Sequence, residues 1–244
     1  MEKRPFFRPG FLSGALLAAS SFVLLFSTRA AAQYGDSLNY LWAAFTGRGL
    51  FHPHHIIFNF VVREMLLLSR ALGLGLTPLD VAQLHNILWA VVAVVSVYAI
   101  GLRVFNSRLW PILAALGLLV SQGFWEYATQ AQSYAPAAGC LALLVFILVR
   151  KPVDHFRARD WALIALLLAV AVLYHQGDIL FVLPLAVFIL ASAVRRGWRP
   201  LLATAVLSGA FVLAAYATAL VSSGGERTVS GFIRFVFSYA YHPA

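Results

Sequence analysis

The sequence has little charge and a single cysteine. Only 11% of its 244 residues are charged and 61% are hydrophobic, whereas a soluble domain has about 25% charged and about 45–50% apolar residues. Together with a mean hydropathy of +0.83, this shortage of charge excludes an ordinary soluble domain and predicts a membrane protein. Because Cys140 is the sole cysteine, an intrachain disulfide is excluded, and we interpret Cys140 as a small core residue.

Seven apolar runs meet or approach the length of a membrane-spanning helix. A helix needs about 20 mostly apolar residues to cross a bilayer, because its backbone polar groups must be hydrogen-bonded internally where water is absent. The third, fifth and sixth runs are short for a full crossing. The sequence therefore predicts an all-α integral membrane protein with about seven transmembrane helices, at residues 10–31, 78–102, 109–125, 130–149, 161–174, 179–194 and 201–221.

Basic residues are concentrated on one side of this alternating topology. Twelve of the 18 lysines and arginines lie before the first run or between runs two and three, four and five, and six and seven. The positive-inside rule assigns that side to the cytoplasm, so the N-terminus is expected inside and the C-terminus outside. Six of the nine acids and six of the seven histidines fall on the exoplasmic side. The net charge of +9 thus indicates membrane orientation, and no nucleic-acid partner is expected.

The chain divides into four parts around these helices. Residues 1–31 are expected to form a cytoplasmic N-terminus and the first span, residues 32–77 an exoplasmic loop, residues 78–221 six further spans, and residues 222–244 the start of another exoplasmic loop. The basic start, the first apolar run and the alanines that follow it also resemble a cleavable signal peptide. A retained span is favoured because the run is long enough to cross and the remaining topology depends on it.

The first exoplasmic loop is too apolar to be a flexible linker. Residues 37–46 predict one helix lying in the membrane interface, and residues 55–72 predict a second. In the second helix Asn59, Arg63 and Arg70 fall on one polar face at 100° per residue. A helix with such a polar face beside an apolar remainder is expected to lie in the membrane interface.

Three polar segments follow one another on the exoplasmic side. They are GDSLNYLWAAFTGRGLFHPHH at 35–55, FWEYATQAQSY at 124–134 and LYHQGDILFVLP at 173–184. With the topology, their order resembles the conserved module of the GT-C glycosyltransferases, more specifically protein O-mannosyltransferase-like and related bacterial members. Each segment is similar to one element of that module: an acid followed by His-Pro, a Glu-x-Tyr element, and a turn that contains a histidine. In the Glu-x-Tyr element, Tyr134 matches the tyrosine, but Gln132 stands where the glutamate is expected.

The resemblance implies an enzyme of the bacterial inner (plasma) membrane with an exoplasmic active site. Its partners would be membrane lipids, a polyprenyl-phosphate-linked sugar donor, and an acceptor that is a lipid, a glycan or a protein. The implied reaction is a direct inverting displacement without a covalent enzyme intermediate. Typical members continue with further spans and a C-terminal domain, which leaves a minimal form and a truncated product as alternatives for this chain.

Asp36 is the candidate catalytic residue. The acceptor hydroxyl loses a proton as its oxygen attacks the anomeric carbon, and a carboxylate within hydrogen-bond reach accepts that proton. The alternative is a structural role, in which Asp36 caps a helix that begins at Ser37. We interpret Asp36 as the base, and one residue can serve both purposes.

The motif His52-Pro53-His54-His55 has two interpretations. Imidazoles bind zinc and similar ions, so a divalent metal is left open as a cofactor and no other cofactor is expected. Adjacent residues rarely aim at one ion, however, and the proline restricts the backbone before it. We favour a turn leading into the second interfacial helix, with His54 hydrogen-bonded to the donor or the acceptor.

Four further residues are candidates for substrate binding. By the resemblance, His175 contacts the donor phosphate or the acceptor, and Asp178, three residues on, would orient its ring as carboxylates often do. Arg48 is the arginine nearest to Asp36 in this loop, and a planar guanidinium matches phosphate geometry. Tyr134 is carried over from the Glu-x-Tyr element. For any one arginine, a position facing solvent or a lipid headgroup is the alternative.

Two other functions stay open beside the glycosyltransferase. A transporter or lipid flippase usually places ionisable residues near the bilayer midplane and breaks its helices in paired halves, and neither feature is evident here. The second is a catalytically incomplete fragment or scaffold of a larger glycosyltransferase.

Overall fold

The computed structural model describes residues 9–33, 35–192 and 198–237. These described residues form helices and no β-strand, so the all-α expectation is confirmed for them. The helices are α1 (Pro9–Ser27), α2 (Asp36–Thr46), α3 (Phe58–Ala71), α4 (Pro78–Val104), α5 (Leu109–Val120), α6 (Gln122–Thr129), α7 (Tyr134–Val149), α8 (Ala158–Tyr174), α9 (Val182–Ser192), α10 (Arg199–Ser222) and α11 (Val229–Phe237), with short 3₁₀ helices η1 (Val153–His155) and η2 (Gln176–Phe181).

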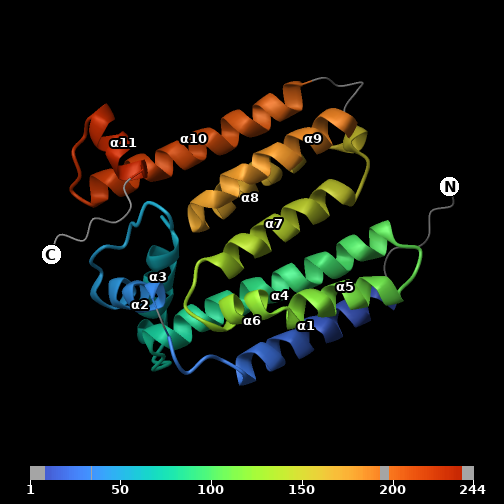
Figure 1. Cartoon of the computed structure of the whole chain (residues 1–244), viewed down its shortest axis with the longest axis horizontal. Helices are drawn as coiled ribbons and strands as arrows, with labels where there is room; N and C mark the ends of the chain where they lie inside the picture. The colour runs from blue at the N-terminus through green and yellow to red at the C-terminus, as the bar shows by residue number, and fades with distance from the viewer. Residues whose placement is uncertain (1–8, 34, 193–197, 238–244) are drawn as a thin grey trace.

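The long helices lie side by side as a bundle. Helix α4 contacts α1, α5 and α7, and α8 contacts α7 and α10. Helices α1 and α5 run antiparallel to α4, and α7 runs antiparallel to α8, whereas α4 and α7 run in the same direction, as do α8 and α10 (Figure 1). Helices α2, α3 and α11 gather at one end of this bundle (Figure 1). Gly139 lets α7 approach α4 closely, because a Cβ there would lie 2.7 Å from the Trp89 ring and 2.8 Å from the Trp89 carbonyl oxygen. Such small residues at helix contacts are typical of membrane proteins.

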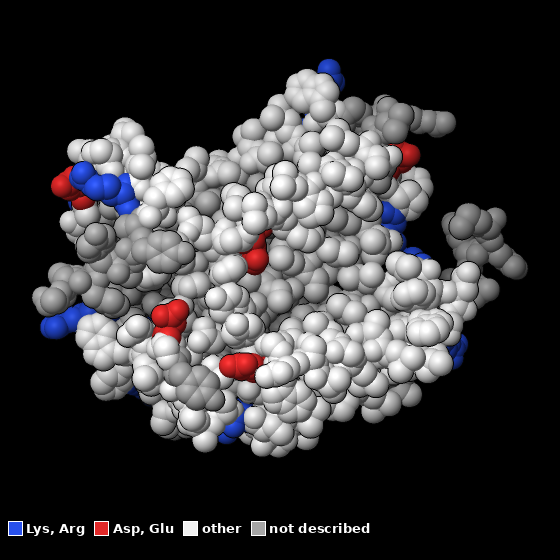
Figure 2. All heavy atoms as spheres, viewed as in Figure 1, with Lys and Arg blue, Asp and Glu red and all other residues white. Residues whose placement is uncertain are grey.

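The bundle has the surface of a membrane protein. The described residues include three helices long and apolar enough to cross a bilayer, at Gly10–Ser27, Pro78–Val104 and Arg199–Ser222. Large apolar side chains such as Phe11, Val187 and Leu213 are 72%, 68% and 58% exposed. Figure 2 shows a face on which uncharged atoms predominate. An apolar surface of this extent is unfavourable in water and suits lipid.

The third expected span is a bent pair of helices. Helix α5 ends at Val120, Ser121 is extended, and α6 leaves at 61°; the two would make a fourth crossing if they form one span. The expected span over 109–125 is therefore broken at Ser121, and part of the segment expected as the loop after it is helical in α6. Helix α7 also begins four residues later than expected, because Asn86 Nδ2 donates to the carbonyls of Gln130 (2.7 Å) and Gln132 (2.6 Å) and holds that segment outside a helix.

The other expected spans are found with shifted or shorter helices. Helices α4 and α10 agree with 78–102 and 201–221 to within two residues at each end. Helix α1 ends at Ser27, before the expected end at residue 31. Helix α8 has 17 residues, and the expected span over 179–194 is divided between η2 and α9.

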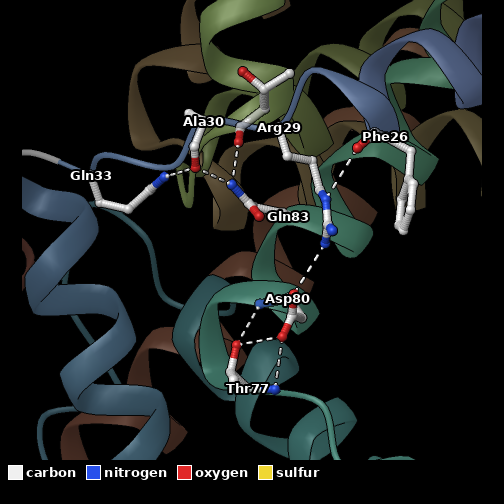
Figure 3. Close-up of polar contacts among 8 residues, drawn as sticks. Phe26, Arg29, Ala30, Gln33, Thr77, Asp80 and Gln83 are labelled. Atoms are coloured by element: carbon white, nitrogen blue, oxygen red, sulfur yellow. Dashed lines mark hydrogen bonds and ion pairs between the residues drawn. The ribbon is translucent and has the colours of Figure 1, made fainter.

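A capping box formed by Thr77 and Asp80 fixes the start of α4, as the sequence predicts. Thr77 Oγ1 accepts a hydrogen bond from the Asp80 backbone N–H (3.1 Å), and the Asp80 carboxylate accepts from the Thr77 N–H (3.1 Å), as in a capping box. Arg29 donates to Asp80 (3.1 Å), and Gln83 Nε2 donates to the carbonyls of Ala30 (2.8 Å) and of the last residue of α6 (2.7 Å; Figure 3). These bonds therefore attach the beginning of the loop after α1 to the first turns of α4.

Helices form where the two interfacial helices were expected. Helix α2 ends at Gly47, whose φ of 75° is left-handed and whose added Cβ would lie 2.6 Å from Arg63 Cζ. Arg63 donates from α3 to the Ala44 carbonyl (3.2 Å) and so caps α2. Of the residues on the expected polar face, Asn59 is buried, with 2% of its surface exposed, which helical periodicity alone does not indicate.

Candidate functional site

A cavity of about 580 Å³ lies where α2, the loop after it and the ends of α7 and α8 meet. Its lining is polar and aromatic: Asp36, Asn39, Tyr40, Trp42, Ala43, Arg48, Gly49, Phe51, His52, His54, His55, Asn59, Tyr134 and His175. The volume is in the range of pockets that bind small molecules, about 300–1,000 Å³.

Five of the six candidate site residues line this cavity. They are Asp36, Arg48, His54, Tyr134 and His175, and they come from α2, the following loop, the start of α7 and the end of α8. The Tyr134 and His175 ring centroids are 4.8 Å apart. Asp178 is outside the lining, but its Oδ1 lies 3.4 Å from His175 Nδ1, which places the carboxylate beside the ring as expected.

Asp36 is the first residue of α2, and Gly35 is the N-cap, with φ 54°. The alternative that Asp36 caps a helix beginning at Ser37 is therefore wrong. The Asp36 side chain is exposed and has no hydrogen bond or ion pair with another described residue. Ser37 next to it accepts a hydrogen bond from Gln132 Nε2 (2.7 Å). The segment before α7 thus holds the start of α2 in place, while the Asp36 carboxylate is left without a partner in the part of the chain that the structure describes.

The loop of residues 48–57, here the histidine loop, is attached to α8, η2 and α10 through its backbone. The His54 carbonyl accepts from the Gln176 N–H (3.1 Å), and the Ile57 N–H donates to the Leu173 carbonyl (3.3 Å). The Tyr216 hydroxyl donates to the Pro53 carbonyl across 163 positions (2.6 Å). These bonds fix the loop against helices that come more than 100 residues later in the chain.

His55 is the most firmly held histidine of the loop. Its Nδ1 lies 3.0 Å from the Tyr174 carbonyl oxygen and 2.7 Å from Ser133 Oγ. The pKa of His55 is lowered from 6.5 to about 4, mainly by burial and also by the nearby His52, His175 and His54, while the hydrogen bond to the Tyr174 carbonyl opposes this shift. The ring is therefore neutral at pH 7. Because a carbonyl oxygen only accepts, the proton lies on Nδ1 and Nε2 keeps its lone pair.

The histidines do not form a metal site among the described residues. No group of three or more His, Cys, Asp or Glu in residues 9–33, 35–192 and 198–237 is arranged to hold an ion. The His52 ring centroid lies 5.4 Å from that of His54 and 5.8 Å from that of His55, and the His54 and His55 centroids are 6.3 Å apart. The arrangement favours a turn over metal binding.

Several lining residues were not singled out from the sequence as site residues. Tyr40 is buried against His55 and Phe58, and burial, together with the nearby Asp36 and Tyr134, raises the pKa of its hydroxyl far above the usual value. Tyr40 therefore presents a neutral hydroxyl. Asn59 was noted only as part of a polar helix face. The spacing of Tyr40 and Asp36, one helical turn apart, is the signal that could have found the first.

Comparison with known proteins gives no family assignment. The sequence matches no protein-family model and no curated protein. The function therefore has to be argued from the cavity and the residues around it.

Proposed function

We propose that the protein is a polytopic membrane glycosyltransferase of the GT-C kind. It transfers a sugar from a polyprenyl-phosphate-linked donor to an acceptor at the exoplasmic face of a bacterial inner membrane. In this proposal α1, α4, α5 with α6, α7, α8, η2 with α9, and α10 are the seven spans, and α2 and α3 lie in the exoplasmic interface.

One observation carries the proposal. Asp36, Arg48, His54, Tyr134 and His175, chosen from segments far apart in the sequence, line a single cavity. The cavity lies at the end of the bundle where α2 and α3 gather (Figure 1). The basic residues that follow α7 and precede the apolar part of α8 lie at the other ends of those helices, which supports an exoplasmic cavity by the positive-inside rule.

The residues that line the cavity suggest a separate role in the reaction for each of them. The acceptor hydroxyl oxygen forms a bond to the anomeric carbon, the bond from that carbon to the donor phosphate oxygen breaks, and polyprenyl phosphate leaves with the bonding electrons. The hydroxyl proton goes to the Asp36 carboxylate, which has no structural partner among the described residues. Arg48 supplies a cation, and His54 and His175 supply ring N–H groups, for the phosphate that leaves.

The test is sugar transfer by purified protein in liposomes that contain labelled polyprenyl-phosphate sugars. Asp36→Asn should lower kcat by about 10²–10⁴-fold, the usual contribution of a general base, with unchanged membrane insertion. Glu64→Gln is the matched control, because Glu64 is an exposed acid of the same loop outside the cavity lining. Full activity of Asp36→Asn would remove Asp36 as the base. No transfer by the wild type from any of a panel of donors would contradict the proposal.

The transporter alternative gains no support from the described spans. In α4 the ionisable Asp80 and His85 lie near one end and Arg103 near the other, whereas coupled transport usually uses such groups near the midplane. His85 Nε2 is also hydrogen-bonded to the Tyr174 hydroxyl (3.0 Å). Lipid or solute flux through the same liposomes that depends on Asp36 would favour transport instead.

A further inference from the structure

Asn59 is a buried amide whose oxygen has no hydrogen-bond partner among the described residues. It lies in the first turn of α3, is 2% exposed, and lines the cavity. Its Oδ1 is buried and accepts no hydrogen bond from another described residue. A buried acceptor without a donor lowers the stability of the fold, so such a group calls for an explanation.

The other buried amides of the described residues are all bonded. Gln83 donates to two carbonyls, Asn86 donates to the carbonyls of the segment before α7, and Gln130 Nε2 donates to Glu126 Oε1 (3.3 Å). These three amides support the fold where helices meet. Asn59 differs because it lines a cavity; its Oδ1 is closed to solvent in the structure, so a ligand in the cavity meets this oxygen once the side chain turns towards it.

We infer that Asn59 binds the sugar of the donor by hydrogen bonds to its hydroxyl groups. This rests on the proposed function, since it identifies which part of the donor Asn59 contacts. An ionised phosphate offers only acceptors and leaves the amide oxygen unpaired. Sugar hydroxyls both donate and accept, so they satisfy the Asn59 oxygen and nitrogen together, and a half-turn of the amide selects which atom meets which hydroxyl.

The neighbouring side chains are consistent with this division. Arg48, His54 and His175 carry the cation and ring N–H groups suited to a phosphate. Asn39, Tyr40 and Asn59 carry neutral groups that both donate and accept. The Tyr40 hydroxyl is held neutral by its raised pKa. The cavity lining therefore offers both groups suited to a phosphate and neutral groups suited to sugar hydroxyls, and Asn59 is one of the neutral groups.

The experiment measures binding in detergent micelles by calorimetry, with two kinds of probe. Farnesyl phosphates linked to mannose, glucose, galactose or arabinose test the sugar contact, and farnesyl phosphate alone is the reference. Asn59→Leu should weaken the tightest sugar-bearing probe about tenfold, the value of one lost hydrogen bond of about 1.4 kcal/mol. Its affinity for farnesyl phosphate should stay within about twofold of wild type. Asn59→Ala serves if leucine does not fit.

Thermal unfolding separates this role from a structural one. Removing an unpartnered buried amide should leave Tm unchanged or raise it, because the desolvation penalty disappears. Ser69→Ala is the matched control: Ser69 lies on α3, its buried Oγ has no partner among described residues, and it is outside the cavity lining. It should change neither probe's affinity.

The outcomes distinguish this inference from the proposed function. Equal weakening of both kinds of probe, or no weakening, overturns the role of Asn59, and so does a wild type that binds no sugar-bearing probe better than farnesyl phosphate. If Asn59→Leu transfers sugar with wild-type kcat/KM, the inference fails and the glycosyltransferase stands. If sugar binding depends on Asn59 but the wild type transfers none, the inference stands and the transfer reaction fails.

Discussion

Acidification should destabilise the fold through His55. The ring is buried, donates from Nδ1 to the Tyr174 carbonyl, and has its pKa lowered from 6.5 to about 4. Below pH 6.5 the unfolded chain takes up a proton at this residue while the folded protein does not, so stability falls as the pH falls towards 4. Between pH 8 and pH 5 these two pKa values correspond to a loss of about 2 kcal/mol.

The assay is equilibrium unfolding in mixed micelles at pH 8 and pH 5. His55→Asn is the informative variant, because the asparagine Nδ2 takes the place of the imidazole Nδ1–H as donor but does not titrate. Its loss of stability on acidification should be smaller than that of the wild type by about 2 kcal/mol. His155→Asn removes an exposed histidine of η1 and should behave as the wild type. Equal losses in wild type and His55→Asn would refute a buried, neutral His55.

Three further substitutions test how the cavity walls are held, each by the free energy of unfolding. Gly47→Ala should cost about 1–2 kcal/mol for the left-handed backbone, and Arg63 must shift from the new Cβ. Asn86→Leu should cost about 2–5 kcal/mol, because a buried carbonyl and a partly buried one lose their donors. Gly139→Ala should cost about 1–3 kcal/mol, since the Cβ meets the Trp89 ring and carbonyl. Neutral results would contradict these contacts.

The sequence predicted features that act over a few residues. Thr77 and Asp80 mark the start of α4 in the sequence, and Gly47 marks the end of α2, because helix caps depend only on residues a few positions away. The topology also predicted that the candidate site residues lie on one side of the membrane, because successive spans run in opposite directions and their polar connections alternate between the two sides. Asp36, Tyr134 and His175 could be brought together on topology alone, and they line one cavity.

Features set by contacts between distant segments could not be predicted. The late start of α7 depends on Asn86, which lies more than 40 residues earlier. The burial of Asn59 depends on elements that periodicity does not identify. Within the His-Pro-His-His motif the sequence favoured His54, yet His55 is held by more hydrogen-bonding groups, because its Nδ1 lies close to Ser133, just before α7, and to the Tyr174 carbonyl of α8. Adjacent residues point in different directions, and only the tertiary fold decides which one is buried.

The length of α8 determines the depth at which the proposed reaction would occur. Its 17 residues span about 26 Å at 1.5 Å per residue, less than the hydrocarbon thickness of about 30 Å. His175 directly follows α8 and lines the cavity, so the cavity floor would lie near the level where the hydrocarbon ends. A polyprenyl donor could then keep its chain in the lipid while its phosphate reaches His175 and Arg48. A longer α8 would place His175 further out in the water, and the donor could then no longer reach it with its phosphate while its chain stays in the lipid.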